Sequence, residues 1–369
     1  MLSAEQALAR IHSALSTQHL ILRSLITQNF RNLAAEEVLF HPTTTLVVGR
    51  NGQGKTNLLE AIYFLATTKS FRTPHLASVI RFDAPSVFAQ GVLARGGVEK
   101  TLSIGLETES RRRVLMINEE RVPLSRYLNA MSVFAYSSAR LEILRGSPEE
   151  RRRFLDRGIA SVDPAYLDAL SRYTRVLKQR NALLQDGKTL DAWDEELAQT
   201  AAVIQKSREA YAMSLAEAFA KIVERHAYHV RALQMIYRPN VLPAKRADEL
   251  RARMTLAGPQ RDQLDFVAAG RPAAEVLSGG EQKMIVLFLK FAKLDLFRAR
   301  FDEPAIFLLD DVDAELDLEI LEQLLLRLPV ETQVFATSAK ERFLSALAAG
   351  RHRRLLIENG RVTTAQDFA

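Results

Sequence analysis

The amino-acid sequence predicts an α/β fold in which one domain is built from both ends of the chain, with a helical segment inserted between its halves. Short runs of alternating apolar and polar residues fill much of the first third of the chain, which indicates strands. From about Tyr136 to Thr255 apolar residues recur at helical spacing instead. Strand-like runs return at Ala305–Leu309 and Gln333–Ala336. We therefore expect an N-terminal extension at 1–20, a first domain part at 21–135, a helical arm at 136–255 and a second domain part at 256–369.

The expected elements can be placed in order. Strands are predicted at 20–27, 37–40, 45–48, 87–92, 100–106 and 113–117, with a turn at Asn118–Arg121. The stretch from Asp191 to roughly Tyr237 has apolar residues at helical spacing and no internal Gly or Pro, so it predicts a long amphipathic helix. Such a helix favours a projecting arm, far too short for the extended coiled coils of chromosome-organising ATPases.

Composition narrows the class of protein. The 369 residues include 50 Lys and Arg against 44 Asp and Glu, and this net charge of +6 suits a polyanionic partner without requiring one. Cysteine is absent, which excludes disulfides, iron–sulfur clusters and thiolate catalysis. The strongest apolar run, Met284–Phe291, is interrupted by Lys290 and falls short of the roughly 18 residues that a membrane span needs. Residues 1–20 lack the hydrophobic core of a signal peptide, so we expect a cytoplasmic protein with no membrane partner.

A glycine-rich segment after the third expected strand predicts a phosphate-binding loop. Gly49–Thr56 fits the pattern G-x-x-x-x-G-K-[ST]. Glycines let the backbone curl so that N–H groups point inward, and the following helix adds the positive end of its dipole. We expect a nucleoside triphosphate here, with Lys55 acting on its β- and γ-phosphates and the Thr56 hydroxyl binding Mg²⁺. The expected contacts are Gly49, Arg50, Asn51, Gly52, Gln53, Gly54, Lys55, Thr56 and Asn57.

An apolar strand that ends in two carboxylates, Ile306–Asp311, predicts the metal-binding and hydrolytic part of this site. A buried parallel strand exposes its first polar residue at its carboxyl end, where α/β proteins bind ligands. Asp310 is placed to hold Mg²⁺, and Asp311 to orient or deprotonate the attacking water. An acidic pair can also simply cap a helix, but its combination with the phosphate-binding loop favours the functional interpretation.

The segment Leu277–Lys283 precedes a long apolar helix and resembles the signature motif of ABC-type ATPases. It offers the Ser278 hydroxyl and glycine N–H groups to a phosphate, and we count Ser278, Gly279, Gly280 and Gln282 among the nucleotide contacts. The alternative is a capping box between Ser278 and Glu281, and the two interpretations are compatible. In ABC-type proteins the signature of one subunit meets the nucleotide held by the other. The resemblance therefore implies ATP bound between two protomers.

Further segments along the chain make the resemblance more specific. Beyond the loop, the signature and the acidic pair, they are Asn29–Asn32, Asn57–Ala61, Lys69–Thr73, Gly146–Pro148, Arg151–Asp156, Tyr173–Asn181, Gly258–Asp262 and Glu315–Asp317. From about Leu20 onward the chain resembles the RecF family of bacterial DNA repair and recombination mediators. An ordinary ABC ATPase would not share the segments that fall in the arm.

This resemblance implies an ABC-type ATPase head with an inserted helical arm, weak DNA-dependent ATP hydrolysis, and homodimerisation on ATP. It also implies binding at single-strand/duplex DNA junctions, and cooperation with RecR, and with RecO, in loading a recombinase at gaps. By position, Arg31 and Asn32 should lie near the nucleotide, Ser278 and Gly280 should serve the partner's ATP, and Asp317 should lie at the dimer interface.

Some positions depart from the family pattern. Ser138-Ala139-Arg140 replaces a segment that usually carries two carboxylates, and Gln260, Glu281 and Asp313 stand where His, Gln and an apolar residue are usual. Thr337 and Ser338 follow the Gln333–Ala336 strand, where ABC transporters carry a His. The departures concern γ-phosphate sensing and head–arm coupling, and they leave the residues of the phosphate-binding loop and the acidic pair intact.

The arm is the expected DNA-binding part. Tyr136–Thr255 holds 21 Lys and Arg against 16 Asp and Glu, a surplus of five and most of the net charge of the chain. Such residues bind phosphates through charge and counterion release, which tolerates any sequence and is sensitive to salt. The alternative is a solvated helix face with internal pairs such as Glu149–Arg153. The candidate DNA contacts are Arg151, Arg152, Arg153, Arg175, Lys178 and Arg180.

Two other functions remain open at this point. The ATPase subunit of a transporter would share the loop and the signature, but it should lack the basic helical insertion. A clamp that closes on ATP without hydrolysing it would share every motif, although Asp311 favours some turnover. A metabolic P-loop kinase is disfavoured, because its chemistry does not require the Leu277–Lys283 motif.

Overall fold

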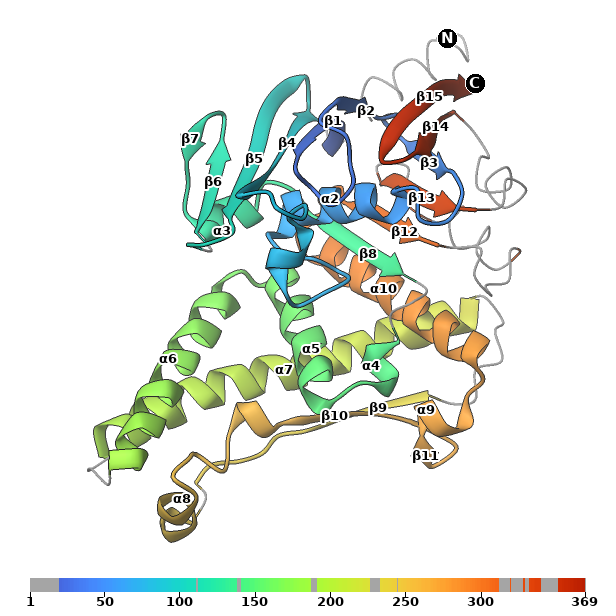
Figure 1. Ribbon diagram of the computed structural model, residues 1–369. Helices are drawn as coiled ribbons and strands as arrows, with labels where there is room; N and C mark the ends of the chain where they lie inside the picture. Colours follow the sequence, from blue (N-terminus) through green and yellow to red (C-terminus); the bar gives the residue numbers. More distant parts are fainter. Residues whose placement is uncertain are drawn as a thin grey trace, which may run out of the picture. The chain divides into compact units, whose positions relative to one another are not determined.

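A computed structural model describes residues 20–110, 112–137, 141–186, 191–225, 233–243, 245–311, 319, 328, 332–339 and 351–368 (Figure 1). The chain divides into two compact units, Met1–Arg140 with Glu303–Ala369, and Leu141–Asp302. The expected residues Ser138–Arg140, Asp313, Asp317 and the extension 1–19 lie outside the described residues.

The first unit contains two six-stranded sheets. The antiparallel sheet has the order β2-β1-β4-β5-β6-β7, and the other, mostly parallel, has the order β15-β14-β3-β13-β12-β8. The strands are β1 (Leu20–Gln28), β2 (Glu37–Leu39), β3 (Thr44–Val48), β4 (Ser86–Arg95), β5 (Val98–Glu107), β6 (Arg113–Ile117), β7 (Glu120–Arg121), β8 (Val133–Ser137), β12 (Ile306–Asp310), β13 (Gln333–Ser338), β14 (His352–Glu358) and β15 (Arg361–Phe368).

One core joins the two sheets through helix α2 (Lys55–Thr67). Phe64 of α2 and Leu25 of β1 belong to the same buried cluster as Leu308 of β12 and Phe335 of β13. The strands β3, β12 and β13 are wholly or largely buried, as expected for central parallel strands. The smaller elements of this unit are η1 (Leu76–Val79) and α3 (Leu124–Leu128).

The second unit is mainly helical (Figure 1). Its elements are α4 (Glu142–Arg145), α5 (Pro148–Val162), α6 (Ala165–Asp186), α7 (Asp191–Arg225), β9 (Leu233–Arg238), α8 (Arg246–Ala252), η2 (Pro259–Arg261), β10 (Gln263–Ala268), β11 (Arg271–Pro272), α9 (Ala273–Val276) and α10 (Gly279–Phe301). The long α7 packs against α5, α6 and α10, which buries its apolar face, including Leu197, Ile204 and Leu215.

Three expectations about these elements need adjustment. Residues 233–237 were expected to extend the long helix, but they form β9, because Leu233–Arg238 pairs antiparallel with β10 and that distant partner outweighs the local helical pattern. The turn expected at Asn118–Arg121 narrows to Asn118 and Glu119, both with positive φ, while Glu120–Arg121 forms β7. Residues 256–302 were expected in the second domain part, yet their contacts group them with the inserted unit.

Candidate nucleotide-binding site

The loop after β3 has the backbone conformation that its glycines predict. Gly49, Gly52 and Gly54 all have positive φ, of 148°, 80° and 117°, and α2 begins directly afterwards at Lys55. A Cβ atom at Gly49 would lie 2.4 Å from the carbonyl oxygen of Ile357, so a side chain at this position would collide with β14. Only glycine fits there, and the loop curls tightly against the sheet.

The side chain of Lys55 folds back over the phosphate-binding loop. Its Nζ donates to the carbonyl oxygens of Gly49 at 2.7 Å and Arg50 at 3.1 Å, and only 7% of the residue is exposed. Arg50 and Asn51 are exposed at the outer side of the loop. The ammonium group is thus held at the segment where the sequence motif predicts phosphates.

Asp310 joins three strands and the start of helix α2. It ends β12, and its Oδ1 accepts hydrogen bonds from Thr56 Oγ1 at 2.8 Å and Thr337 Oγ1 at 3.0 Å, while Oδ2 accepts one from Ser137 Oγ at 3.2 Å. The carboxyl ends of β3, β8, β12 and β13 lie at the same sheet edge, since Asp310 is in register with Ser137, and Ser338 with Val48. Burial raises the pKa of Asp310, and the three hydroxyl donors oppose this rise.

This arrangement fits a magnesium ion. Thr56 and Asp310 supply adjacent hydroxyl and carboxylate oxygens, the ligand type that Mg²⁺ prefers. No cluster of three or more His, Asp or Glu side chains that could bind a metal occurs in the described parts of the chain. A magnesium ion here would therefore take its remaining ligands from phosphates and water, as is usual for this ion.

Asp311 differs from its neighbour. It is exposed and has a positive φ of 55°, and its N–H donates to Thr337 Oγ1 at 2.8 Å. One hydroxyl thus touches both members of the acidic pair, because Thr337 also donates to Asp310. Thr337 and Ser137 were absent from the residues predicted for the site, and the only signal in the sequence was their position at the ends of apolar strands.

Arg31 and Asn32 lie in a network that covers one side of α2. Arg31 forms a bidentate ion pair with Glu60, with distances of 2.9 and 2.8 Å. Asn57 Nδ2 donates to Asn32 Oδ1 at 2.7 Å, and Arg72 donates to Asn57 Oδ1 at 2.6 Å and to Glu60 at 3.3 Å. Glu60 is fully buried and was not predicted, although a charged residue in the apolar run Leu58–Ile62 was a visible signal.

The signature segment lies in the second unit. Ser278 caps α10, its Oγ accepts from Glu281 N at 3.3 Å, and the Glu281 carboxylate accepts from Ser278 N at 2.7 Å, so the capping box is present. Ser278 is exposed, whereas Gln282 is 1% exposed. The side chain of Gln282 bonds to Leu277 O, Ala274 O and Arg145 Nε at 2.7, 3.2 and 2.6 Å. These internal bonds give Gln282 a structural role in holding the signature loop.

The candidate DNA contacts fall into two groups. Arg175 and Lys178 are exposed on α6. Arg180 is 5% exposed and donates to Asp194, Thr255 and Glu249 at 2.7, 2.8 and 2.6 Å, so its guanidinium group is committed inside the unit.

The three consecutive arginines of α5 are also partly engaged. Arg151 and Arg152 are half-buried and donate to the carbonyl oxygens of Gly146 and Asp262. Arg153 forms ion pairs with Glu149 and Glu150. The pair with Glu149 agrees with the alternative interpretation of a solvated helix face with internal ion pairs.

The fold and the loop–carboxylate arrangement define the class of protein as a P-loop ATPase head. The family described as the RecF/RecN/SMC N-terminal domain matches residues 21–355. The DNA replication and repair protein RecF of Geotalea daltonii is 32% identical over 364 residues, covering 92% of this chain and 99% of that protein. The RecF protein of Lactococcus lactis subsp. cremoris is also 32% identical, covering 86% and 92%. This chain therefore belongs to the RecF family.

Solved structures agree with this assignment. A structure of "the recombination mediator protein RecF-ATP in RecFOR pathway" has a TM-score of 0.83 and 25% identity, covering 96% of this chain and 99% of that one. An Smc head bound to the C-terminal winged-helix domain of ScpA has a TM-score of 0.54 at 14% identity, and it shares the fold alone. Among the described helices of our chain, none is both long and apolar enough to span a membrane.

Proposed function

We propose that this chain is an ATP-binding mediator of DNA repair and recombination that dimerises on ATP and acts at single-strand/duplex junctions. The observation that carries the proposal is the hydrogen bond between Thr56 and Asp310, which joins the phosphate-binding loop to the end of β12. Lys55, held by loop carbonyls, supplies the positive charge beside them. Solved relatives described as RecF with ATP support the choice of nucleotide.

Within this proposal each residue has a separate task. Thr56 and Asp310 would hold Mg²⁺, which neutralises charge on the phosphates when bound. Lys55 binds the β- and γ-phosphates, and Asp311, exposed beside Thr337, orients the attacking water. The hydrolysis that we propose is weak, as the resemblance to the RecF family implies.

Dimerisation follows from the signature segment. Ser278 is exposed at the first turn of the 23-residue helix α10, and an added Cβ at Gly279 would meet nothing within 4 Å. A phosphate can therefore approach the N–H group of Gly279 from outside the unit. We infer that the ATP of a second protomer occupies this place, with Gly280 near the dimer interface.

DNA, RecR and RecO are the proposed partners, and loading of a recombinase at gaps is the proposed outcome. The exposed cations Arg175 and Lys178 are the leading DNA contacts, with Arg151, Arg152 and Arg153 as a secondary group. A protein that serves chromosomal DNA in a bacterium works in the cytoplasm, and no membrane partner is proposed.

Binding of the Asp311→Asn protein to gapped DNA, followed by fluorescence anisotropy with and without MgATP, tests the proposal. Because the change removes the water-orienting carboxylate and leaves Thr56 and Asp310, ATP should stay bound and DNA affinity should rise by about tenfold or more. Lys55→Ala is the matched control, and it should show no gain from ATP. DNA binding that is absent in both nucleotide states would contradict the DNA part of the proposal.

ATP turnover measured on the wild-type protein and on Asp311→Asn separates the remaining alternative, a clamp that does not hydrolyse ATP. Wild-type hydrolysis that falls by at least about tenfold in Asp311→Asn supports the assigned role. Wild-type protein that binds ATP without measurable hydrolysis would identify a nucleotide-gated clamp instead.

A further inference from the structure

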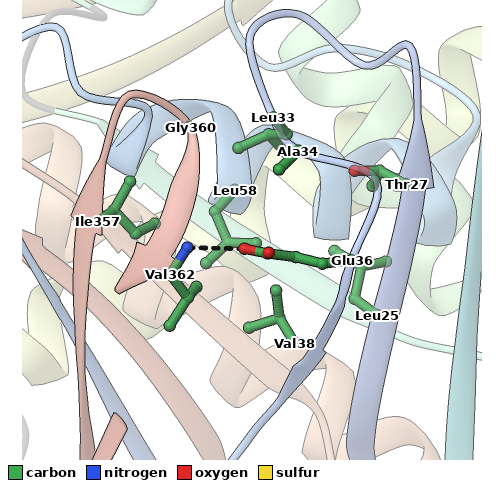
Figure 2. Close-up of a pocket in the computed structure, with 10 residues that line it drawn as sticks. All are labelled: Leu25, Thr27, Leu33, Ala34, Glu36, Val38, Leu58, Ile357, Gly360 and Val362. Carbon is green, nitrogen blue, oxygen red and sulfur yellow. Dashed lines mark hydrogen bonds between the residues drawn. The ribbon is translucent and has the colours of Figure 1, made fainter. Parts of the chain in front are cut away.

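The turn between β14 and β15 lies directly against the phosphate-binding loop. The two strands are joined by Asn359 and Gly360, whose φ angles of 50° and 77° are those of a tight two-residue hairpin. Figure 2 shows Gly360 at the tip of this hairpin, beside Leu33 and Ala34 of the loop that follows β1. We call Asn359 and Gly360 the hairpin tip.

The hairpin tip is bonded to two segments of the candidate site. Gly360 N donates to the carbonyl oxygen of Gln53 at 2.7 Å, and Asn359 N donates to Gln53 Oε1 at 2.7 Å. In the other direction, Ala34 N donates to the carbonyl oxygen of Gly360 at 2.8 Å. One backbone turn therefore connects the phosphate-binding loop with the Arg31–Ala34 segment.

The contact leaves no room for a side chain. A Cβ at Gly360 would lie 1.9 Å from the carbonyl oxygen of Asn32, and a Cβ at Gly54 would lie 3.2 Å from Gly360 Cα. Asn32 in turn accepts a hydrogen bond from Asn57 on α2. Any displacement of the tip therefore moves backbone atoms of both the phosphate-binding loop and the Arg31–Ala34 segment.

The base of the hairpin is held by apolar packing and by one further hydrogen bond. Ile357 and Val362 pack with Leu33 and Leu58, and Val362 N donates to Glu36 Oε1 at 2.8 Å (Figure 2). The cavity among these residues measures about 10 Å³, too small for anything larger than a water molecule. It is part of the core, and it gives the tip a rigid support.

A second hairpin in the same unit provides the comparison. Gly96 and Gly97 join β4 and β5 with φ angles of 56° and 80°, so the backbone matches that of the hairpin tip. A Cβ at Gly97 would meet nothing within 4 Å. The close approach at Gly360 therefore results from the position of this hairpin against the Asn32 backbone, and a two-residue turn by itself does not require it.

We propose that the hairpin tip is a positioning element of the nucleotide site, which sets the spacing between the phosphate-binding loop and the Arg31–Asn32 segment. This inference rests on the proposed binding of ATP at that loop. In this proposal the tip makes no direct contact with the nucleotide. Its effect is transmitted through Gln53 on one side and Asn32 on the other.

The test compares Gly360→Ala with Gly97→Ala. Both changes add a methyl group at a positive φ in a two-residue hairpin, so the conformational cost is matched. Fluorescent-ATP titration in the presence of Mg²⁺ should give a dissociation constant about tenfold or more above wild type for Gly360→Ala, and one within about twofold for Gly97→Ala. The melting temperature without nucleotide should fall further for Gly360→Ala than for Gly97→Ala, because only the methyl group at position 360 collides with backbone atoms.

Different outcomes identify which idea has failed. A wild-type protein that does not bind ATP contradicts the proposed function itself. Equal dissociation constants for the two variants, with wild type binding normally, overturn the positioning role. Should Gly360→Ala not fold, hydrogen exchange on the wild-type protein decides. MgATP should slow exchange at Asn359, Gly360 and Ala34 and leave Gly96 and Gly97 unchanged, and equal exchange with and without nucleotide at all five overturns the role.

Discussion

Asp310 keeps a carboxylate at a position that is 4% exposed, and three hydroxyl donors from Thr56, Thr337 and Ser137 compensate only part of its lost hydration. Burial raises the pKa of its carboxyl group above the ordinary 3.8. The folded protein therefore holds this proton to a higher pH than the unfolded chain does. The contribution of Asp310 to stability falls as pH rises from below 3.8 through the folded pKa, and above that pKa the buried charge only costs free energy.

Asp310→Asn should consequently give a protein that is more stable at pH 7 without ligands but has lost magnesium-dependent ATP binding by at least about tenfold. Melting curves with and without MgATP measure both effects, since bound ligand raises the melting temperature. Wild type should gain stability from MgATP and the variant should not. Asp311→Asn is the control, because the exposed Asp311 should leave the ligand-free stability nearly unchanged. A variant less stable than wild type at pH 7 would contradict this account.

A comparison of individual residues shows which parts of the site could be predicted from the sequence. Thr56 and Asp310 lie together as their motifs predict, because local patterns fix Lys55 and Thr56 at the start of α2 and Asp310 at the end of β12. Glu60, Thr337 and Ser137 were missed, because their partners come from segments distant in the chain. Arg180 and Gln282 match basic and signature patterns, yet both are buried in hydrogen-bond networks, and residue type alone does not reveal exposure.

At the scale of secondary structure, one buried ion-pair network joins several elements of the second unit. Arg208 of α7 donates to Asp156 of α5 at 2.9 Å and to Asp262 at 2.8 Å. Asp262 also accepts from Tyr237 of β9 at 2.5 Å and from Gln205 of α7 at 2.9 Å. The basic residue count of the arm includes Arg208, but this arginine is 3% exposed. The strand β9, which the helical periodicity did not predict, is held in place partly by this network.

Arg208→Met should destabilise the second unit by about 3–5 kcal/mol, because it leaves the buried Asp262 carboxylate and the partly buried Asp156 carboxylate without their cation. Urea unfolding followed by the fluorescence of Trp193, the single tryptophan of the chain, reports on α7 directly. Arg172→Ala removes an exposed pair with Glu196 between α6 and α7 and should cost less than about 1 kcal/mol. Equal unfolding midpoints for the two variants would show that the network adds nothing beyond an ordinary surface pair.

At the scale of the whole molecule, the net charge of +6 does not act as a uniform field, because many of the basic side chains are committed to internal pairs. Arg180 and Arg208 are buried among carboxylates, and Arg153 is paired on the surface of α5. Arg175 and Lys178 are the exposed candidates that remain on α6. Nucleic-acid binding by this chain should therefore depend on a few free cations and not on its total charge.

The salt dependence of DNA binding tests this distinction. Each Lys or Arg contact to a phosphate releases counterions when the protein binds DNA, so a variant with fewer contacts releases fewer counterions. Replacing Arg175 and Lys178 together by Ala should reduce the slope of log affinity against log salt by about 1.4–1.8, which corresponds to two contacts. Anisotropy titrations of gapped DNA at four salt concentrations give this slope. Arg172→Ala is the matched control on the same helix, and its pairing with Glu196 predicts a smaller change. Equal slopes of log affinity against log salt for wild type and the double variant would assign the DNA contacts to other residues. The half-buried arginines of α5 would then be the next to replace.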